Sequence, residues 1–289
     1  PPRLFERFGD ITMTVFFSEQ RVTNRVTAIR TLTGELLYLV EGATRAALID
    51  SSLGIRGLRA FVERLTKKPI VTILTHGHVD HAMGGPEFDN VYMNSLDVPV
   101  YDEMAALKVR REFIDLSLGD ASPRMNDSDF VPPHPLNFED LTDGQIFDLG
   151  GICVEALHFP GHTPGMTAIL IPEERILITG DACNQRTFLW DHNSTSVEEY
   201  RDSVLSMKER TADSYDRLFI SHMTMDMPLS LFDEAIELCD QVLNEDVDDV
   251  PFEFMGSSAL IAKRFDESQA RLDGKSFNLV YSKDRMWRQ

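Results

Sequence analysis

The feature that most constrains this chain is the segment 75–81, which reads Thr-His-Gly-His-Val-Asp-His and follows the apolar run 70–74. Four side chains that commonly bind metals stand within six positions there: His76, His78, Asp80 and His81. Imidazoles and carboxylates packed so densely beside a buried strand need partners or a cation to offset the cost of burial. Only eight histidines occur in the chain and three lie here, so a solvated histidine-rich loop is disfavoured. The segment predicts a metal site at a strand exit.

Three later side chains of the same chemical types also follow apolar runs: His162, Asp181 and His222. Strand exits are the places where a rigid scaffold presents functional loops. A single histidine after a strand is more often structural than catalytic, but three such residues together with the first motif favour a shared metal site. Imidazole and carboxylate donors suit zinc, iron or manganese, and the sequence has no cysteine pair of the kind that holds structural zinc.

The hydrophobic pattern predicts an α/β chain in which two strand-rich halves flank a helical insertion. A capping box, Ser196 with Glu199, marks the start of one predicted helix. The predicted strands are 36–40, 46–49, 70–74, 145–148, 152–159, 166–171, 175–179, 217–221, 257–265 and 276–282, and the predicted helices are 57–65, 197–210 and 229–243, with helical stretches around 100–118. We expect a single domain over 1–289, with the insertion at about 97–137 and a C-terminal extension from about 226.

Charge and composition limit the partners that we expect. The chain has 28 basic and 47 acidic residues, a net charge of -19, whereas nucleic-acid binding requires a basic surface that neutralises phosphates. No run approaches the roughly 18 apolar residues of a membrane helix. The partner that we predict is a small-molecule substrate, without nucleic acid or membrane, and a homo-oligomer is left open.

Two observations favour a cytoplasmic location. Three scattered cysteines, Cys153, Cys183 and Cys239, do not form a disulfide framework and suggest a reducing compartment. The chain also opens with Pro1-Pro2-Arg3 rather than with a charged and then apolar signal segment.

On the run His76-x-His78-x-Asp80-His81 and the order of the later ligands, the chain resembles the metallo-β-lactamase superfamily over about residues 20–225. The resemblance implies a four-layer αβ/βα sandwich with the site at one edge of two facing sheets. It also implies the role of each ligand. The first metal is held by His76, His78 and His162, the second by Asp80, His81 and His222, with Asp181 bridging both and Asp50 orienting a ligand from behind.

The implied activity is that of a metallohydrolase with two metal ions, zinc first and iron or manganese as alternatives. A metal-bound hydroxide would attack a small ester, thioester, lactone or phosphodiester, and Asp80 is the candidate to move a proton. Asp181 is similar to the bridging residue of glyoxalase II-like hydrolases, lactonases and phosphodiesterases, and unlike true β-lactamases. Asn184 and Gln185 stand where acyl-homoserine lactonases carry a tyrosine, which disfavours that branch.

Other interpretations keep the same fold. A non-heme iron oxidoreductase of the persulfide dioxygenase kind uses a subset of these ligands, and a catalytically silent binding protein would be expected to lack some of them. A thiol role for Cys183 is disfavoured, because buried thiols are commonly inert. An apolar substrate wall could include five side chains, although core packing is at least as favoured for each: Met104, Phe113, Phe188, Trp190 and Met223.

Overall fold

The computed structural model describes residues 5–8, 11–14, 16–132 and 138–288. Its contacts divide the chain into two compact units, 1–155 and 156–289, with the boundary inside strand β11 (Cys153–His158). The single domain expected over 1–289 and its C-terminal extension stay predictions. The opening residues 1–4 and part of the predicted insertion, 133–137, lie outside the described residues.

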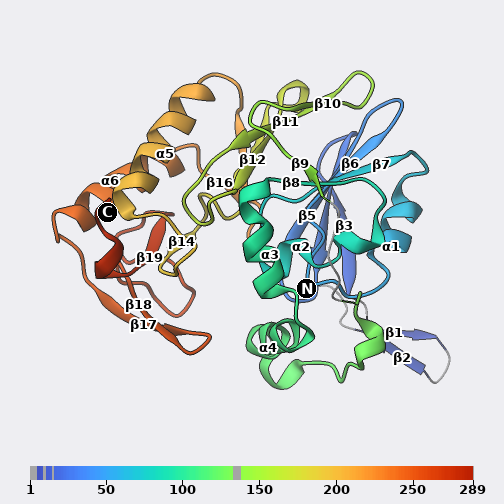
Figure 1. Cartoon of the computed structure of the whole chain (residues 1–289), viewed down its shortest axis with the longest axis horizontal. Coiled ribbons are helices and arrows are strands. Elements are labelled where there is room, and N and C mark those ends of the chain that lie inside the picture. The colour runs from blue at the N-terminus through green and yellow to red at the C-terminus, as the bar shows by residue number, and fades with distance from the viewer. Residues whose placement is uncertain (1–4, 9–10, 15, 133–137, 289) are drawn as a thin grey trace. The chain divides into compact units, whose positions relative to one another are not determined.

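Unit 1 is built on a seven-stranded sheet in which neighbours in sequence are neighbours in space (Figure 1). The strands are β3 (Phe17–Arg21), β4 (Val26–Thr31), β5 (Leu36–Glu41), β6 (Ala46–Ile49), β7 (Ile70–Ile73), β8 (Val91–Met93) and β9 (Glu139–Asp140). Pairing is antiparallel from β3 to β6 and parallel from β6 to β9. A parallel pair needs a crossover, and helix α1 (Leu58–Leu65) supplies it between β6 and β7.

The sequence pattern explains how α1 covers this sheet. Leu58, Phe61 and Val62 recur at helical spacing and are buried in one cluster with Leu39 and Leu48 of the sheet. The remaining elements of unit 1 are short: the hairpin β1 (Phe5–Phe8) and β2 (Ile11–Thr14), helices α2 (Val79–Ala82), α3 (Val98–Met104) and α4 (Leu107–Leu118), and strand β10 (Ile146–Asp148), which pairs with β11. The described part of the predicted insertion contains the helices α3 and α4, followed by a segment that is mostly loop.

Unit 2 has a sheet in the order β11-β12-β13-β15-β16, covered by two helices. The strands after β11 are β12 (Thr167–Ile171), β13 (Ile176–Ile178), β15 (Arg217–Phe219) and β16 (Asp226–Met227). Helices α5 (Val197–Arg210) and α6 (Leu231–Leu243) bury their apolar faces in one cluster with these strands. The capping box is present, since the Ser196 hydroxyl accepts from Glu199 N and the Glu199 carboxylate accepts from Ser196 N.

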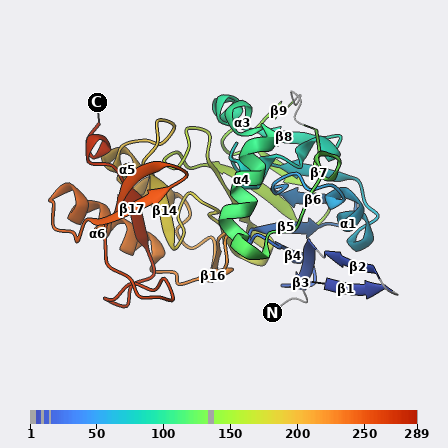
Figure 2. The same cartoon turned by 90° about the horizontal axis from the view of Figure 1, so that it is seen from below.

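A second sheet of unit 2 has the order β14-β19-β18-β17. Its outer strands β14 and β17 are labelled in Figure 2. It consists of β14 (Arg186–Leu189), β17 (Val250–Phe254), β18 (Ser257–Ile261) and β19 (Asn278–Tyr281). The predicted strands 257–265 and 276–282 are shorter in the structure, and β14 and β17 were not predicted. Pro251 argues against a strand at this position, because proline cannot donate to a strand ladder and is confined mainly to edge strands. The structure shows that β17 is such an edge strand.

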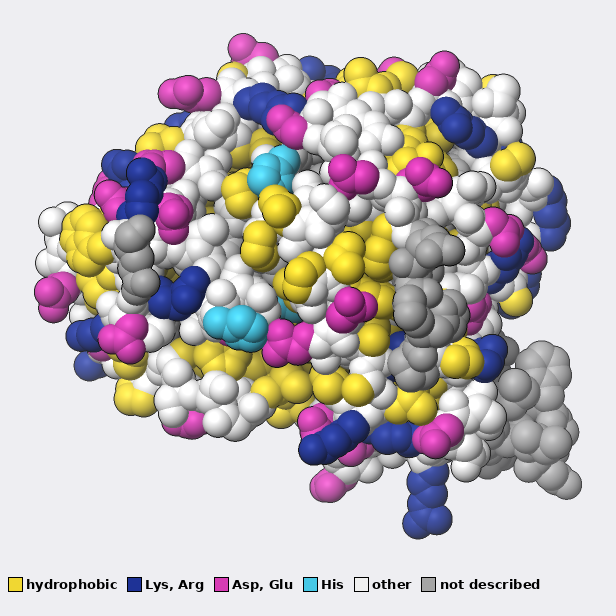
Figure 3. All heavy atoms as spheres, in the orientation of Figure 1, with side chains coloured by type: hydrophobic (Ala, Val, Ile, Leu, Met, Phe, Trp, Pro, Cys, Tyr) yellow, Lys and Arg dark blue, Asp and Glu magenta, His cyan; other side chains and the backbone are white. Residues whose placement is uncertain are grey.

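Charged side chains of both signs are interspersed on the face drawn in Figure 3. Within the described part of the chain, every helix is too short or too polar to cross a bilayer.

Candidate metal centre

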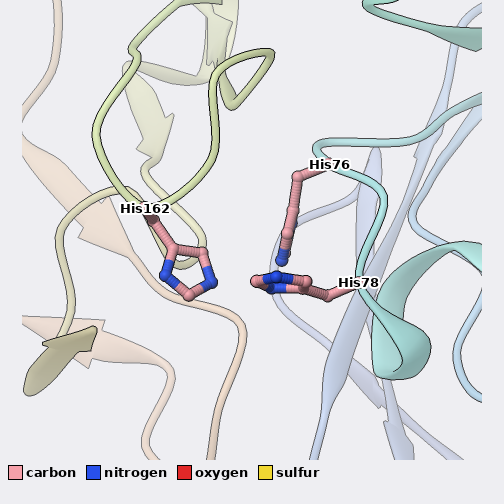
Figure 4. A group of neighbouring side chains, drawn as sticks. All are labelled: His76, His78 and His162. Carbon is pink, nitrogen blue, oxygen red and sulfur yellow. The ribbon is translucent and has the colours of Figure 1, made fainter. Parts of the chain in front are cut away.

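The loop after β7 presents two histidines because Gly77 separates them at a very close approach. Gly77 N donates to Asp97 Oδ2 at 2.9 Å, and an added Cβ would lie 2.6 Å from Asp97 O and 2.7 Å from Tyr101 N. Only glycine therefore lets this loop lie against the start of α3. His76 and His78 project from the loop with ring centroids 4.8 Å apart (Figure 4).

We expect Gly77→Ala to destabilise the protein by about 1–3 kcal/mol, because the methyl group meets backbone atoms that cannot move aside. The metal affinity of the loop should fall as well, since both histidines would shift. Urea unfolding and metal titration measure the two effects. Gly57→Ala is the control: its Cβ meets nothing within 4 Å, so it carries only the cost of a positive φ. Equal destabilisation by both variants would contradict this account.

Asp50, which directly follows β6, holds this loop through hydrogen bonds of its carboxylate. Its carboxylate is buried and accepts from Thr75 N at 2.7 Å, from Thr75 Oγ1 at 2.9 Å and from His81 Nδ1 at 2.9 Å. The Asp50 backbone has a φ of 63°, a left-handed conformation that aspartate tolerates better than most residues. Asp50 therefore links the backbone of the loop with the His81 ring, and its role in orienting a metal ligand stays a prediction.

The directions of these hydrogen bonds decide which ring nitrogens can bind a metal. A carboxylate only accepts, so His81 Nδ1 carries a proton and the Thr75 hydroxyl donates its own proton to Asp50. Thr75 Oγ1 also lies 3.1 Å from His76 Nδ1, and its oxygen then accepts from that nitrogen. His76 and His81 both carry the proton on Nδ1, so Nε2 is the ring nitrogen of each that can bind a metal.

His162, in unit 2, is fixed in the same way by a main-chain oxygen. Its Nδ1 donates to Phe188 O of β14 at 2.8 Å, so Nε2 is the ring nitrogen that can bind a metal. Figure 4 shows the His162 ring together with those of His76 and His78. The neighbouring Gly161 lies against the ring of Tyr200, where an added Cβ would be 2.4 Å from Cδ2. Tyr200 is itself anchored by donating to Ala182 O at 2.8 Å. The loop of His162 is thus held by both α5 and β14.

Asp181 is the central carboxylate of unit 2. It follows β13 and Gly180, whose φ of 55° turns the chain at this point. Asn184 Nδ2 donates to Asp181 Oδ1 at 3.2 Å, while Oδ2 lies 3.0 Å from His222 Nε2 and 3.8 Å from His162 Nε2. One oxygen of the Asp181 carboxylate therefore lies close to the Nε2 atoms of two imidazole rings.

The donor atoms have the chemistry and the spacing that zinc requires. Ligands bound at 2.0–2.1 Å in a tetrahedral site lie about 3.3 Å from one another. In unit 1, Asp80 Oδ2 and His81 Nε2 are 3.4 Å apart, and in unit 2 the Asp181 distances of 3.0 and 3.8 Å bracket the same value. Imidazoles and carboxylates that are mostly buried and are oriented by hydrogen bonds have the chemistry that a divalent cation requires.

Cys183, whose thiol was considered for a role in the site, belongs to the apolar core of unit 2. The thiol is fully buried in the apolar cluster under α5 and α6, and burial raises its pKa to about 12. A thiol with so high a pKa is neither a ready nucleophile nor a ready ligand.

The five side chains of the predicted apolar wall lie in different surroundings. Met104 and Phe113 pack against the core of unit 1, whereas Phe188 and Trp190 belong to an aromatic cluster of unit 2. Met223 is 68% exposed. Four residues that support the site or this cluster were missed from the sequence: Thr75, Asn184, Phe252 and Phe254. Thr75 and Asn184 lie close in sequence to ligands, which is a weak signal, and nothing in the sequence connects β17 with β14.

The family model for the metallo-beta-lactamase superfamily matches residues 30–222 of this sequence. The chain belongs to the metallo-beta-lactamase superfamily. The match begins in β4 and ends at His222, so it includes every predicted ligand. The predicted family is confirmed.

Solved structures of the superfamily confirm the fold class. The metallo-beta-lactamase FIM-1 from Pseudomonas aeruginosa has a TM-score of 0.57 at 17% identity, covering 79% of this chain and 96% of its own. The sec-alkylsulfatase Pisa1 from Pseudomonas sp. has a TM-score of 0.62 at 15% identity, covering 79% of this chain and 42% of its own. At these identities the likeness concerns the fold alone.

Curated relatives are named as thioesterases and hydrolases. Human acyl-coenzyme A thioesterase MBLAC2 is 27% identical over 168 residues, which is 50% of this chain and 57% of the relative. Hydroxyacylglutathione hydrolase GloC from Haemophilus influenzae is 30% identical over 143 residues, 48% of this chain and 62% of the relative. This chain thus spans little more than half the length of these relatives. Their names support the prediction that a superfamily member with this ligand set is an enzyme.

Proposed function

We propose that this protein is a metallohydrolase that uses two zinc ions to cleave acyl thioesters or related small esters. One observation carries the proposal: a single oxygen of Asp181 faces the Nε2 atoms of both His162 and His222. A carboxylate so placed can join two cations. The relatives named as thioesterases support the thioester as the first substrate class to test, ahead of the lactone and the phosphodiester.

The ligands divide into two groups in this proposal. The first ion would be held by His76, His78 and His162, and the second by Asp80, His81 and His222, as the family resemblance implies. The grouping is supported by the shared chemistry of the donors and by the hydrogen bonds that aim Nε2 of His76, His81 and His162. Asp181 serves both ions, as the family resemblance implies.

Metal ions bound there would lower the pKa of water toward neutrality and polarise the substrate carbonyl. Two carboxylates of the chain have further roles in this proposal. Asp80 is the carboxylate that accepts the proton of the attacking water, and Asp50 keeps the His81 ring in the tautomer that ligates. Asp50 therefore acts through His81 and is a positioning residue.

The test combines metal analysis with a substrate panel. Protein purified without added metal should contain about two zinc ions per chain and should hydrolyse thioesters faster than esters, lactones or phosphodiesters. His78→Ala should lose metal and activity, because one of the three histidine ligands of the first ion is removed. Asp216→Ala, which removes an exposed carboxylate paired with Arg175, is the control and should change neither. Unchanged turnover in His78→Ala would overturn the site.

Two other results would point to other functions. Iron at one position together with oxygen consumption would favour the oxidoreductase, and a metal-loaded protein inert toward the whole panel would favour a silent binding protein.

Chelation should also destabilise the fold, because ions that bind only the folded state stabilise it by mass action. We expect a chelator to lower Tm by roughly 2–4 °C for each kcal/mol of lost binding free energy. Differential scanning calorimetry with and without added zinc measures this shift. In the control, excess zinc restores the original Tm, and a Tm indifferent to chelation would contradict the proposed ligand set.

A further inference from the structure

The second sheet of unit 2 carries a group of aromatic side chains that lie outside the main apolar core under α5 and α6. Phe188 and Trp190 come from β14 and its end, and Phe252 and Phe254 come from β17; we call these four residues the aromatic cluster. Ring centroids of Phe188 lie 5.8 Å from Phe252 and 5.5 Å from Phe254, and Trp190 lies 6.1 Å from Phe254. All four side chains are only partly buried.

The strand order and the register of this sheet bring the four rings to one face. β14 and β17 are its two edge strands, and between them β19 and β18 place short aliphatic side chains: Val280, Ile261 and Ala259. Phe188 pairs with Val280, and Phe252 with Ala259. The rings from the edges therefore meet above a floor of small buried residues.

Strand alternation separates this cluster from the main core. Leu189, between Phe188 and Trp190, points to the other side and is buried in the cluster under α5 and α6. On β17, Glu253 is exposed while Phe252 and Phe254 on either side of it are partly buried. The aromatic face is thus a separate apolar surface, and such surfaces commonly bind ligands.

The same strand connects the cluster with the metal ligands. The carbonyl oxygen of Phe188 accepts from His162 Nδ1 at 2.8 Å. Just before β14, Asn184 donates to Asp181 and accepts from Arg186 N at 2.8 Å. One short segment, 184–190, therefore positions two proposed ligands and carries two of the four rings.

We propose that the aromatic cluster binds the apolar acyl chain of the substrate, so that the protein prefers acyl groups of several carbons over acetyl. This inference rests on the proposed function. The cluster's connection to His162 favours a substrate group over a second copy of the chain as occupant. None of the four rings offers a charge or a strong hydrogen-bonding group, apart from the Trp190 indole N–H, so chain length rather than polarity should set the affinity.

Fluorescence of Trp190 tests the binding without requiring hydrolysis. The chain has two tryptophans, and Trp287 is 55% exposed, so Trp287→Phe leaves Trp190 as the reporter. Titration of this variant with acetate, butanoate, hexanoate and octanoate should give a saturable change in Trp190 emission. Affinity should rise roughly fourfold with each added methylene, from about 0.8 kcal/mol per buried CH₂.

Variants locate the effect. In the Trp287→Phe background, Phe254→Ala should weaken octanoate binding at least about tenfold, and in the full enzyme it should lower kcat/KM for octanoyl but not acetyl thioesters, mostly through KM. Leu272→Ala, which truncates an exposed apolar side chain outside the cluster, is the matched control and should change neither. Circular dichroism and Tm show whether Phe254→Ala is folded; Phe252→Ala is the second variant should it not be.

The outcomes separate this inference from the proposed function. Thioester hydrolysis without chain-length preference, and without an emission change, overturns the acyl site and leaves the hydrolase standing. If the emission of Trp190 depends on protein concentration and not on octanoate, the cluster lies in a contact between copies of the chain. This result also overturns the acyl site. Octanoate binding in a protein that hydrolyses no thioester overturns the assignment to a substrate acyl group.

Discussion

Replacing Asp181 with asparagine is expected to lower kcat/KM for the best thioester by about a thousandfold or more. The substitution keeps the size of the side chain and removes the negative charge from the oxygen that faces His162 and His222. The loss corresponds to several kcal/mol of transition-state stabilisation, the scale attributed to metal catalysis. Steady-state kinetics with equal metal loading measure the effect, and metal analysis should show at least one ion weakened.

Asp216→Asn is the matched control, because it changes the same chemical group at an exposed ion pair with Arg175. It should retain wild-type kinetics and metal content. If Asp181→Asn kept more than about a tenth of the activity with both ions bound, Asp181 would not be the bridging ligand.

Replacing Asp50 should have the second-largest effect, and two substitutions separate its charge from its backbone. Asp50→Asn keeps the left-handed conformation with little strain, since asparagine also tolerates a positive φ. It places an amide where Thr75 and His81 donate, so metal affinity should fall about 10–100-fold, as for other residues that orient ligands. Competition with a chromophoric chelator measures the affinity.

Asp50→Ala should additionally destabilise the fold by about 1–3 kcal/mol for each buried donor left without an acceptor. Thermal unfolding of the metal-free variants isolates this contribution from metal binding. Metal affinity and stability unchanged in both variants would contradict the role of Asp50.

Local sequence determined most of the helices and the ligand types. Helix α5 has the predicted bounds, and its start could be predicted because the capping box of Ser196 and Glu199 acts within one turn. The run from His76 to His81 predicted a metal site, because a strand exit rarely carries so many imidazoles and carboxylates for another reason. Gly57, by contrast, lies just outside α1 as its N-cap, a difference of one residue that helix periodicity does not resolve.

What only the tertiary structure decided depends on atoms far apart in sequence. The tautomers of His76 and His81 follow from Asp50, which lies 25 positions before Thr75 and 31 before His81. The aromatic cluster joins residues near 190 with residues near 250, across a sheet whose outer strand contains a proline. Hydrophobic periodicity reports which face of one element is buried, but strand order and register come from pairing between distant segments. The sequence by itself therefore determined the types and the order of the candidate ligands. The tertiary structure decided how their rings are oriented and which aromatic side chains lie on the strand that supports His162.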